Sequence, residues 1–200
     1  MGKKAKPAAK PSAKTTKPVG PANSAKPATK PSEKISKPVS EAKSTTKKVS
    51  FADVKPIADA WVKEYANALN QNAKYARAAK GWGVSFDGSL MFVMEKSGEV
   101  DTDINIFIDL KDGKCLDARL LAPGENPPRK PGMTLRCPLW MWKQVAFKEI
   151  EPISAIMQNK MKLEGDMKLA MRYASAAMEL ANTVEKTDRT LFTKFNIGKA

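Results

Sequence analysis

Two stretches decide the fold: INIFIDLKDGKCLDARLL at residues 104–121 and SAIMQNKMKLEGDMKLAM at residues 154–171. Apolar and polar side chains alternate over residues 104–110, as is typical of a β-strand with one buried face. Asp112-Gly113 favours a two-residue hairpin turn, because glycine accepts a positive φ and this turn matches the twist of the flanking strands. The first stretch therefore predicts a hairpin whose second strand covers residues 115–121.

The second stretch predicts a short helix, a short strand and a closing helix. A helix that starts at Pro152 leads into residues 160–164, which are too few for another helix before Gly165 and alternate as a strand does. Asp166 then favours the closing helix, because an acidic side chain in the first turn lies near the positive end of the helix dipole. We expect the inner face of the closing helix to consist of Met167, Ala170, Met171, Ala174, Met178 and Ala181.

The remaining segments complete an α+β pattern. Ser50 or Asp53 can cap a first helix, whose apolar residues recur every four positions at Ile57, Trp61, Tyr65 and Leu69. A loop rich in proline is expected over residues 122–132. Further helices are expected over residues 73–80 and 139–147, and further strands over residues 84–86, 89–94 and 133–136.

Trp140 and Trp142 are two positions apart in one of these expected helices. Residues with this spacing point to nearly opposite sides of a helix. We therefore expect one indole ring to be buried and the other to be exposed. An exposed tryptophan would suit a membrane interface, with contact to a partner or partial burial as the alternatives.

Residues 1–50 differ in composition from the rest of the chain. They contain 13 lysines and only two acidic residues, so they carry +11 of the net charge of +14 and leave +3 to residues 51–200. Proline and mutually repelling lysines cannot build a core. We expect residues 1–50 to form a disordered basic tail rich in Lys, Pro and Ala, and residues 51–200 to form one domain.

Residues 154–171 resemble the signature of the sterol carrier protein type 2 lipid-binding domains. In that family a short helix leads into a Gly-Lys-Leu-Lys strand, a Gly-Asp or Gly-Asn turn and a Met-rich helix. The order of elements agrees with the family from about Trp61 to Glu185, although Lys148 and Asn159 stand where the family usually has glycine. The resemblance implies an α+β fold, with a five-stranded sheet covered by helices, an apolar tunnel and a long C-terminal helix near the mouth of the tunnel.

The resemblance also implies a function. Such domains bind or transfer sterols, fatty acids, fatty acyl-CoA or phospholipids in the tunnel without catalysing a reaction. Methionine suits a tunnel wall, because its unbranched side chain repacks around ligands of different shape. Taken from the pattern alone, the same residues could be ordinary core. The ligand-binding residues that the resemblance implies are Ala155, Ile156, Met157, Gln158, Met161, Leu163, Met167, Ala170 and Met171.

The residue content gives no support to an enzyme, a metal site or a cofactor. The chain has no histidine, which removes the commonest general base and any His-ligated metal. It also lacks a glycine-rich phosphate loop. Cys115 and Cys137 do not have the spacing of metal ligands. We interpret them as small buried thiols, with a position on neighbouring strands as the alternative.

The basic tail provides the alternative function. A polycation binds phosphate polymers by releasing counterions, so the tail could bind nucleic acid or another polyanion. Transient contact with an anionic membrane is expected for the same reason. No secretory signal and no apolar run of membrane-spanning length is seen in the sequence, so we expect a cytoplasmic protein.

Deleting residues 1–49 tests these two functions. If the lysines act by charge, the deletion weakens association with anionic vesicles and with DNA, and binding by the intact chain falls steeply with salt. Lipid occupancy of the remaining domain is then unchanged. The nucleic-acid alternative requires submicromolar DNA binding by the full chain at physiological salt, abolished by the deletion, together with a domain that contains no lipid.

Overall fold

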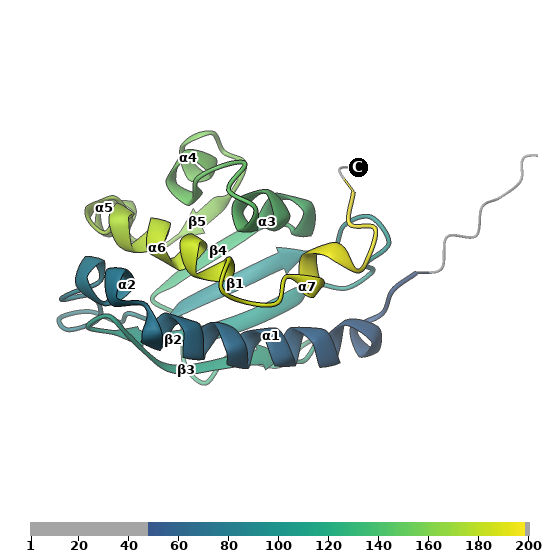
Figure 1. Ribbon diagram of the computed structural model, residues 1–200, viewed down its shortest axis with the longest axis horizontal. Coiled ribbons are helices and arrows are strands. Elements are labelled where there is room, and N and C mark those ends of the chain that lie inside the picture. Colours follow the sequence, from purple (N-terminus) through teal and green to yellow (C-terminus); the bar gives the residue numbers. More distant parts are fainter. Residues whose placement is uncertain (1–47, 199–200) are drawn as a thin grey trace, which may run out of the picture. The chain divides into compact units, whose positions relative to one another are not determined.

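The computed structural model describes residues 48–198, so the tail expected over residues 1–50 lies, up to residue 47, outside the described residues. Figure 1 shows the arrangement of the elements. In chain order they are α1 (Phe51–Gln71), α2 (Ala73–Ala78), β1 (Leu90–Glu95), β2 (Ile104–Lys111), β3 (Lys114–Leu121), β4 (Met133–Pro138), α3 (Leu139–Ala146), α4 (Pro152–Met157), β5 (Lys162–Glu164), α5 (Met167–Arg172), α6 (Ala174–Val184) and α7 (Thr190–Thr193). The α+β class and the five-stranded sheet are confirmed.

The sheet is mixed, with the strand order β3-β2-β1-β4-β5. Strand β1 pairs with β4 in parallel, and all other neighbours are antiparallel. The β2–β3 hairpin has positive φ at both Asp112 and Gly113, as a tight hairpin turn requires. The Asp112 carboxylate accepts a hydrogen bond of 2.8 Å from the backbone N–H of Gly81, which fixes the hairpin against the segment after α2.

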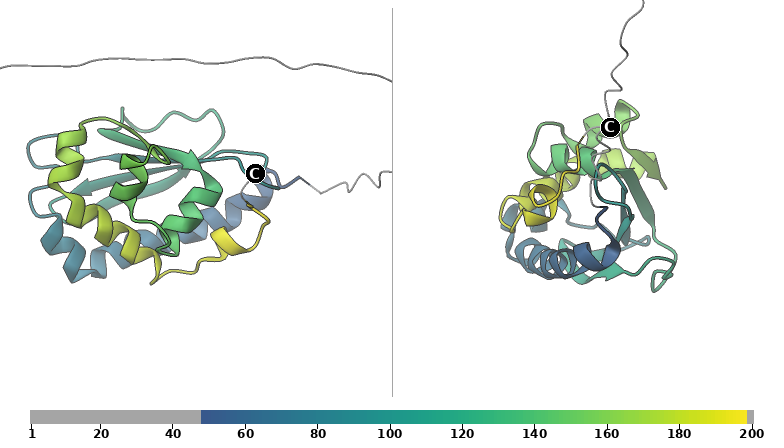
Figure 2. Two further views of the ribbon diagram at one scale, coloured as in Figure 1. Left: turned by 90° about the horizontal axis from the view of Figure 1, so that it is seen from above. Right: turned by 90° about the vertical axis from the view of Figure 1, so that its right-hand side faces the viewer.

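The helices gather on one face of the sheet, as the end-on view in Figure 2 shows. The main core lies between this face and the helices, and Leu90, Phe92 and Met94 of β1 point into it. Met91 and Val93 point to the opposite face, where they are buried with Phe107 and Leu121 in a small second cluster. Strand β1 is apolar throughout because it is covered on both sides.

The proline-rich loop over residues 122–132 covers this second cluster, and Arg129 attaches it to the sheet. The Arg129 guanidinium lies 5.5 Å from the centre of the Phe107 ring and forms ion pairs of 2.6 Å with Asp109 and 3.1 Å with Asp87. Desolvation alone would raise the pKa of Asp87, but hydrogen bonds from Ser89 and Arg129 outweigh it and hold the pKa below its usual range. The loop is thus held by charge and stacking, not by regular secondary structure.

Ser50 caps α1, and the capping expectation is confirmed. The Asp53 carboxylate accepts hydrogen bonds from the backbone N–H of Ser50 at 3.0 Å and from its hydroxyl at 2.7 Å. Buried residues of α1 then follow a helical stripe that includes Trp61, Tyr65 and Leu69. Across residues 48–198 every helix is too short or too polar to span a bilayer.

Both residues that replace a family glycine adopt the backbone conformation that glycine favours. Lys148 has φ of 60° and Asn159 has φ of 55°. Asn tolerates this left-handed region better than most residues, whereas Lys does not. The Lys148 ammonium also lies 2.8 Å from the Glu185 carboxylate, so the turn after α3 is tied to the end of α6.

The expected strand over residues 84–86 is wrong. The segment from residue 79 to residue 86 forms turns, because Trp82 and Phe86 pack edge to face at 5.2 Å and Trp82 also meets Tyr173 at 5.2 Å. The Trp82 indole N–H donates to the Gly88 carbonyl at 2.7 Å, which folds the segment back on itself.

Of the two tryptophans of α3, Trp142 is buried, as expected for one of the two rings. Trp140, the ring expected to be exposed, is half-buried.

The expected inner face of the closing helix is wrong for its methionines. The helix is interrupted at Tyr173 and forms α5 and α6, whose buried residues include Ala170, Ala176, Ala181 and Val184. Met167, Met171 and Met178 are exposed. Two side-chain hydrogen bonds hold α6 in its rotation: Tyr65 donates to the Leu180 carbonyl at 2.9 Å, and Asn72 donates to the Thr183 hydroxyl at 2.9 Å.

Asn72 has two structural roles, so its removal should be costly. Its side-chain oxygen accepts from the backbone N–H groups of Lys74 and Tyr75, which caps α2, while its amide donates to Thr183 in the core. Asn72→Ala should lower the free energy of unfolding by roughly 2–3 kcal/mol, from a lost cap and a lost buried bond. Urea denaturation measures this, with Asn67→Ala, at an exposed position of α1, as the control. Equal loss in the two variants would contradict the role assigned to Asn72.

Candidate ligand-binding site

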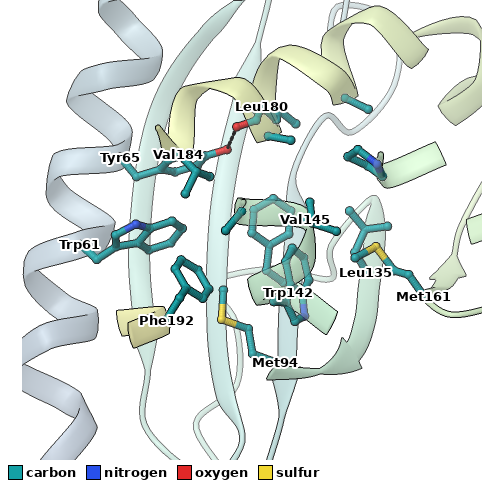
Figure 3. A pocket seen from close by; sticks show the side chains of 15 residues that line it. Trp61, Tyr65, Met94, Leu135, Trp142, Val145, Met161, Leu180, Val184 and Phe192 are labelled. Atoms are coloured by element: carbon teal, nitrogen blue, oxygen red, sulfur yellow. Dashed lines mark hydrogen bonds between the residues drawn. The ribbon is translucent and has the colours of Figure 1, made fainter. Parts of the chain in front are cut away.

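Two apolar cavities lie between the sheet and its helices, each with a volume of about 50 Å³. Figure 3 shows the first cavity, with Trp61 and Tyr65 of α1 on one side and Met161 and Leu135 on the other. Its lining comes from α1, the sheet, α3, α4, α6, α7 and the segment before β5, and consists of Trp61, Tyr65, Phe92, Met94, Leu135, Trp142, Val145, Ala146, Pro152, Met161, Ala177, Leu180, Ala181, Val184 and Phe192. Every one of these side chains is apolar or aromatic.

Aromatic contacts hold one wall of the first cavity in place. Trp61 stacks on Tyr65 with ring centres 4.8 Å apart, and Phe192 meets Trp61 edge to face at 5.7 Å. Such contacts fix ring orientation beyond simple burial. Residues of α1 and α7, far apart in the chain, therefore form one continuous aromatic surface.

The polar atoms of these aromatic side chains are satisfied within the protein. The Trp61 indole N–H donates to the Thr187 hydroxyl at 3.0 Å, and the Trp142 indole N–H donates to the Val93 carbonyl at 3.1 Å. The Tyr65 hydroxyl donates to the Leu180 carbonyl, the bond drawn as a dashed line in Figure 3. Since each donor is already used, the first cavity offers an apolar ligand a carbon surface with no competing polar group.

The second cavity lies beside the first, under α5 and the start of α6. Leu135, Pro152, Ala177 and Leu180 line both cavities. The two cavities are therefore separated by a single layer of side chains. The rest of the second lining is Tyr75, Ala79, Trp82, Leu90, Leu110, Met133, Ile153, Ile156, Leu163, Ala170, Tyr173 and Ala176.

Tyr75 differs from the other aromatic residues of the site. It lines the second cavity, and its hydroxyl is the one buried side-chain N or O atom within residues 48–198 that has no hydrogen-bond partner. Burial raises the pKa of this hydroxyl, with a smaller contribution from Cys115, so it stays protonated at neutral pH. An unpaired buried hydroxyl costs free energy, which a polar atom of a ligand could recover.

The nine residues that the family resemblance implied fall into three groups. Four line a cavity: Met161 the first, and Ile156, Leu163 and Ala170 the second. Ala155 is fully buried beside them but lines neither. The structure places the other four at the surface, outside both cavities: Met157, Gln158, Met167 and Met171. A role in ligand contact stays a prediction for all nine.

Sequence reasoning missed the contribution of α1, α3 and α7. The sequence predicted Trp61 and Tyr65 as part of one apolar stripe of the first helix. Both are buried, and both also line the first cavity. Phe192 gave no signal, because residues 185–198 contain no long apolar repeat. A usable signal was the run of small residues, with Ala170, Ala177 and Ala181 at helical spacing, since small side chains facing a sheet leave space.

Cys115 and Cys137 are buried free thiols, as interpreted from the sequence. Burial raises the pKa of each thiol to about 12. They lie on β3 and β4, which β2 and β1 separate, so the alternative of neighbouring strands is wrong. Neither thiol is suited to act as a nucleophile, because the reactive form is the thiolate.

Comparison with known proteins relates this fold to the domains of one family. A model of the SCP-2 sterol transfer family matches residues 66–178. The crystal structure of sterol carrier protein 2 is similar with a TM-score of 0.56 and 24% identity, over 64% of this chain and 96% of that chain. The solution structure of a conserved hypothetical protein from Thermus thermophilus is similar with a TM-score of 0.55 and 25% identity, over 64% of this chain and 86% of that one. No match was found among curated proteins.

Two lysine substitutions separate cavity from surface. Met161 is 2% exposed and Met171 is 45% exposed, so Met161→Lys should lower the free energy of unfolding by at least about 3 kcal/mol and Met171→Lys by less than about 0.5 kcal/mol. Desolvation depresses the pKa of a buried lysine, so the unfolded state binds more protons and stability of Met161→Lys should rise with pH up to about 10. Denaturation at several pH values measures both effects. Similar losses in the two variants would show that Met171 is not at the surface.

Proposed function

Since the chain belongs to the SCP-2 sterol transfer family, we propose that residues 51–200 bind one apolar lipid or acyl chain and transfer it without catalysing a reaction. The observation that carries the proposal is the pair of adjoining cavities whose lining is apolar and aromatic. Sterols, fatty acids, fatty acyl-CoA and phospholipids all present the carbon surface that such a lining accepts. Residues 1–50 are proposed as a basic tail outside this domain.

Transfer requires that the ligand leave as readily as it enters. Burying a sixteen-carbon chain is worth up to roughly 13 kcal/mol against water, at about 0.8 kcal/mol per methylene, but a bilayer offers nearly the same gain. The free energy of the ligand should therefore be similar in protein and membrane. This near parity favours exchange over storage.

Entry of a lipid requires the interior to expand. Each cavity of about 50 Å³ is far smaller than the roughly 300–1,000 Å³ of ordinary ligand pockets. Ala177 and Leu180 of α6 belong to the wall between the cavities. A displacement of α6 away from the sheet would merge the two cavities, and it would have to break the hydrogen bonds from Tyr65 to Leu180 and from Asn72 to Thr183.

Tyr75 supports a ligand that carries a polar atom at one end. Its unpaired hydroxyl can donate to the oxygen of a sterol hydroxyl, a carboxyl group or an acyl carbonyl. A ligand made only of carbon and hydrogen would leave this donor unsatisfied. Nucleic-acid binding through the tail stays a prediction from composition, because the tail lies outside the described residues.

Native mass spectrometry of gently purified protein, followed by a panel of fluorescent lipid analogues, tests the proposal. Ala177→Leu places extra carbon at the wall shared by both cavities, so it should lower affinity for the best analogue at least about tenfold through steric exclusion. Ala60→Leu, at an exposed position of α1, is the matched control and should bind as the wild type does. If the wild type binds no lipid or sterol in the panel, the carrier function fails. If Ala177→Leu binds normally, the ligand lies elsewhere.

A further inference from the structure

Exposed methionines are concentrated on one part of the surface. Six large apolar side chains are well exposed within residues 48–198, and four of them are Met157 at 65%, Met167 at 40%, Met171 at 45% and Met178 at 42%. They belong to α4, α5 and α6, which are consecutive helices around β5 (Figure 1). Isolated exposed apolar residues are ordinary, but four on adjoining elements indicate a contact surface. We call these four residues the methionine face.

Four cationic side chains lie beside these methionines in the sequence of α4, β5 and α5 and the segments that join them. Lys160, Lys162, Lys168 and Arg172 are all exposed, and none of them forms an ion pair with any residue that the structure describes. The acidic residues between positions 157 and 178 are Glu164 and Asp166. Glu179 follows Met178, and its carboxylate accepts hydrogen bonds from the side-chain amides of Asn72 and Asn182. The Asp166 carboxylate is engaged, because it accepts hydrogen bonds from the backbone N–H groups that begin α5.

The two kinds of side chain run in parallel along α5. Met167 and Met171 are four residues apart and share one side of the helix, while Lys168 and Arg172 form the next row. An apolar row beside a cationic row is the pattern of helices that lie in a membrane interface. Methionine fits such a surface, because a flexible side chain needs no fixed complementary shape among disordered acyl chains.

The methionine face is the outer side of a wall whose inner side is the second cavity. In α5, Ala170 lines the second cavity while Met167 and Met171 are exposed. In α4, Ile156 lines the cavity and its neighbour Met157 is exposed. A lipid would therefore have to cross only one layer of structure between the cavity and this surface.

We infer that the methionine face docks the protein on anionic lipid bilayers and that α5 is the gate between bilayer and second cavity. The inference rests on the proposed lipid-carrier function and adds the face that meets the membrane. The methionines enter the boundary between headgroups and acyl chains, and the four cations contact anionic headgroups. Docking places the wall of the second cavity against the lipid that is to be exchanged.

Site-specific depth measurements on the full chain test this surface. A cysteine at position 167 (Met167→Cys) carries an environment-sensitive fluorophore, and the native thiols interfere little because both are buried. Leu116→Cys is the matched control, because Leu116 is 59% exposed on β3, at the opposite edge of the sheet from β5. The lysine-rich tail would bring either labelled protein to a vesicle, so depth of insertion is the readout and total binding is not.

With vesicles of phosphatidylcholine and phosphatidylserine, the probe at position 167 should shift to the blue and be quenched by brominated acyl chains. The probe at position 116 should do neither. Equal quenching at the two positions, or none at position 167, would overturn the inference. Insertion at position 167 that does not depend on phosphatidylserine would overturn the role of the cations.

A charge reversal tests the mechanism separately. Lys168→Glu with Arg172→Glu should remove quenching at position 167 and slow lipid transfer to anionic vesicles at least about tenfold, since each cation near such a surface is worth roughly fivefold in affinity. Lys111→Glu with Lys114→Glu makes the same charge change on the β2–β3 hairpin, where both lysines are exposed, and should do neither. Equal effects of the two reversals would show that only the net charge of the protein matters, and would contradict a specific role for Lys168 and Arg172. Should the first reversal fail to fold, the depth measurements on the wild-type background decide alone.

The outcomes also separate this inference from the proposed function. Protein that carries lipid but does not insert at position 167 removes the docking face and leaves the carrier function intact. Protein that inserts at position 167 but contains no lipid and takes up none removes the carrier function, and with it the gate, while the docking face stands.

Discussion

Helix α6 is held over the sheet by two side-chain hydrogen bonds. The alanines on its inner face are too small to hold it there by packing alone. The Tyr65 hydroxyl reaches the Leu180 carbonyl, and the Asn72 amide reaches the Thr183 hydroxyl. Both donors belong to the α1–α2 region, so the first helices of the domain fix the height and the rotation of a late one. With alanines beneath it, α6 leaves space that a leucine-rich helix would have filled. The two cavities depend on this arrangement.

The sheet and most helices were predictable from local chemistry. Alternation over residues 104–110 and the Asp112-Gly113 turn predicted the β2–β3 hairpin, and a cap at Ser50 or Asp53 predicted the start of α1. Each of these signals is contained within a few residues. The strand expected over residues 84–86 failed because Trp82 and Phe86 are held by contacts with a distant residue, Tyr173. No pattern in the local sequence contains that information.

The candidate site was predicted only in part, for the same reason. The closing helix carries an alanine stripe and a methionine stripe, and hydrophobicity favours the methionines as the buried side. In α6 the hydrogen bonds from Tyr65 and Asn72 favour the alanine side instead, and they join residues more than a hundred positions apart. Of the residues that the family resemblance implied, Met161, Ile156, Leu163 and Ala170 line the cavities, and their contact with a ligand stays a prediction. The resemblance could not determine which neighbours of these residues face outward.

Hydrogen-bond donors in the cavity walls that are already paired within the protein limit how well the site can select between lipids. Trp61, Trp142 and Tyr65 direct their polar atoms to protein partners, so most of the interior can distinguish ligands only by length and bulk. Discrimination of this kind is shallow, because one methylene more or less in an apolar pocket changes binding by only about 1–3 kcal/mol, whereas a site built around hydrogen bonds rejects a wrong ligand far more strongly. A carrier with such walls would accept a family of lipids, and the composition of the donor membrane would then decide which lipid it holds.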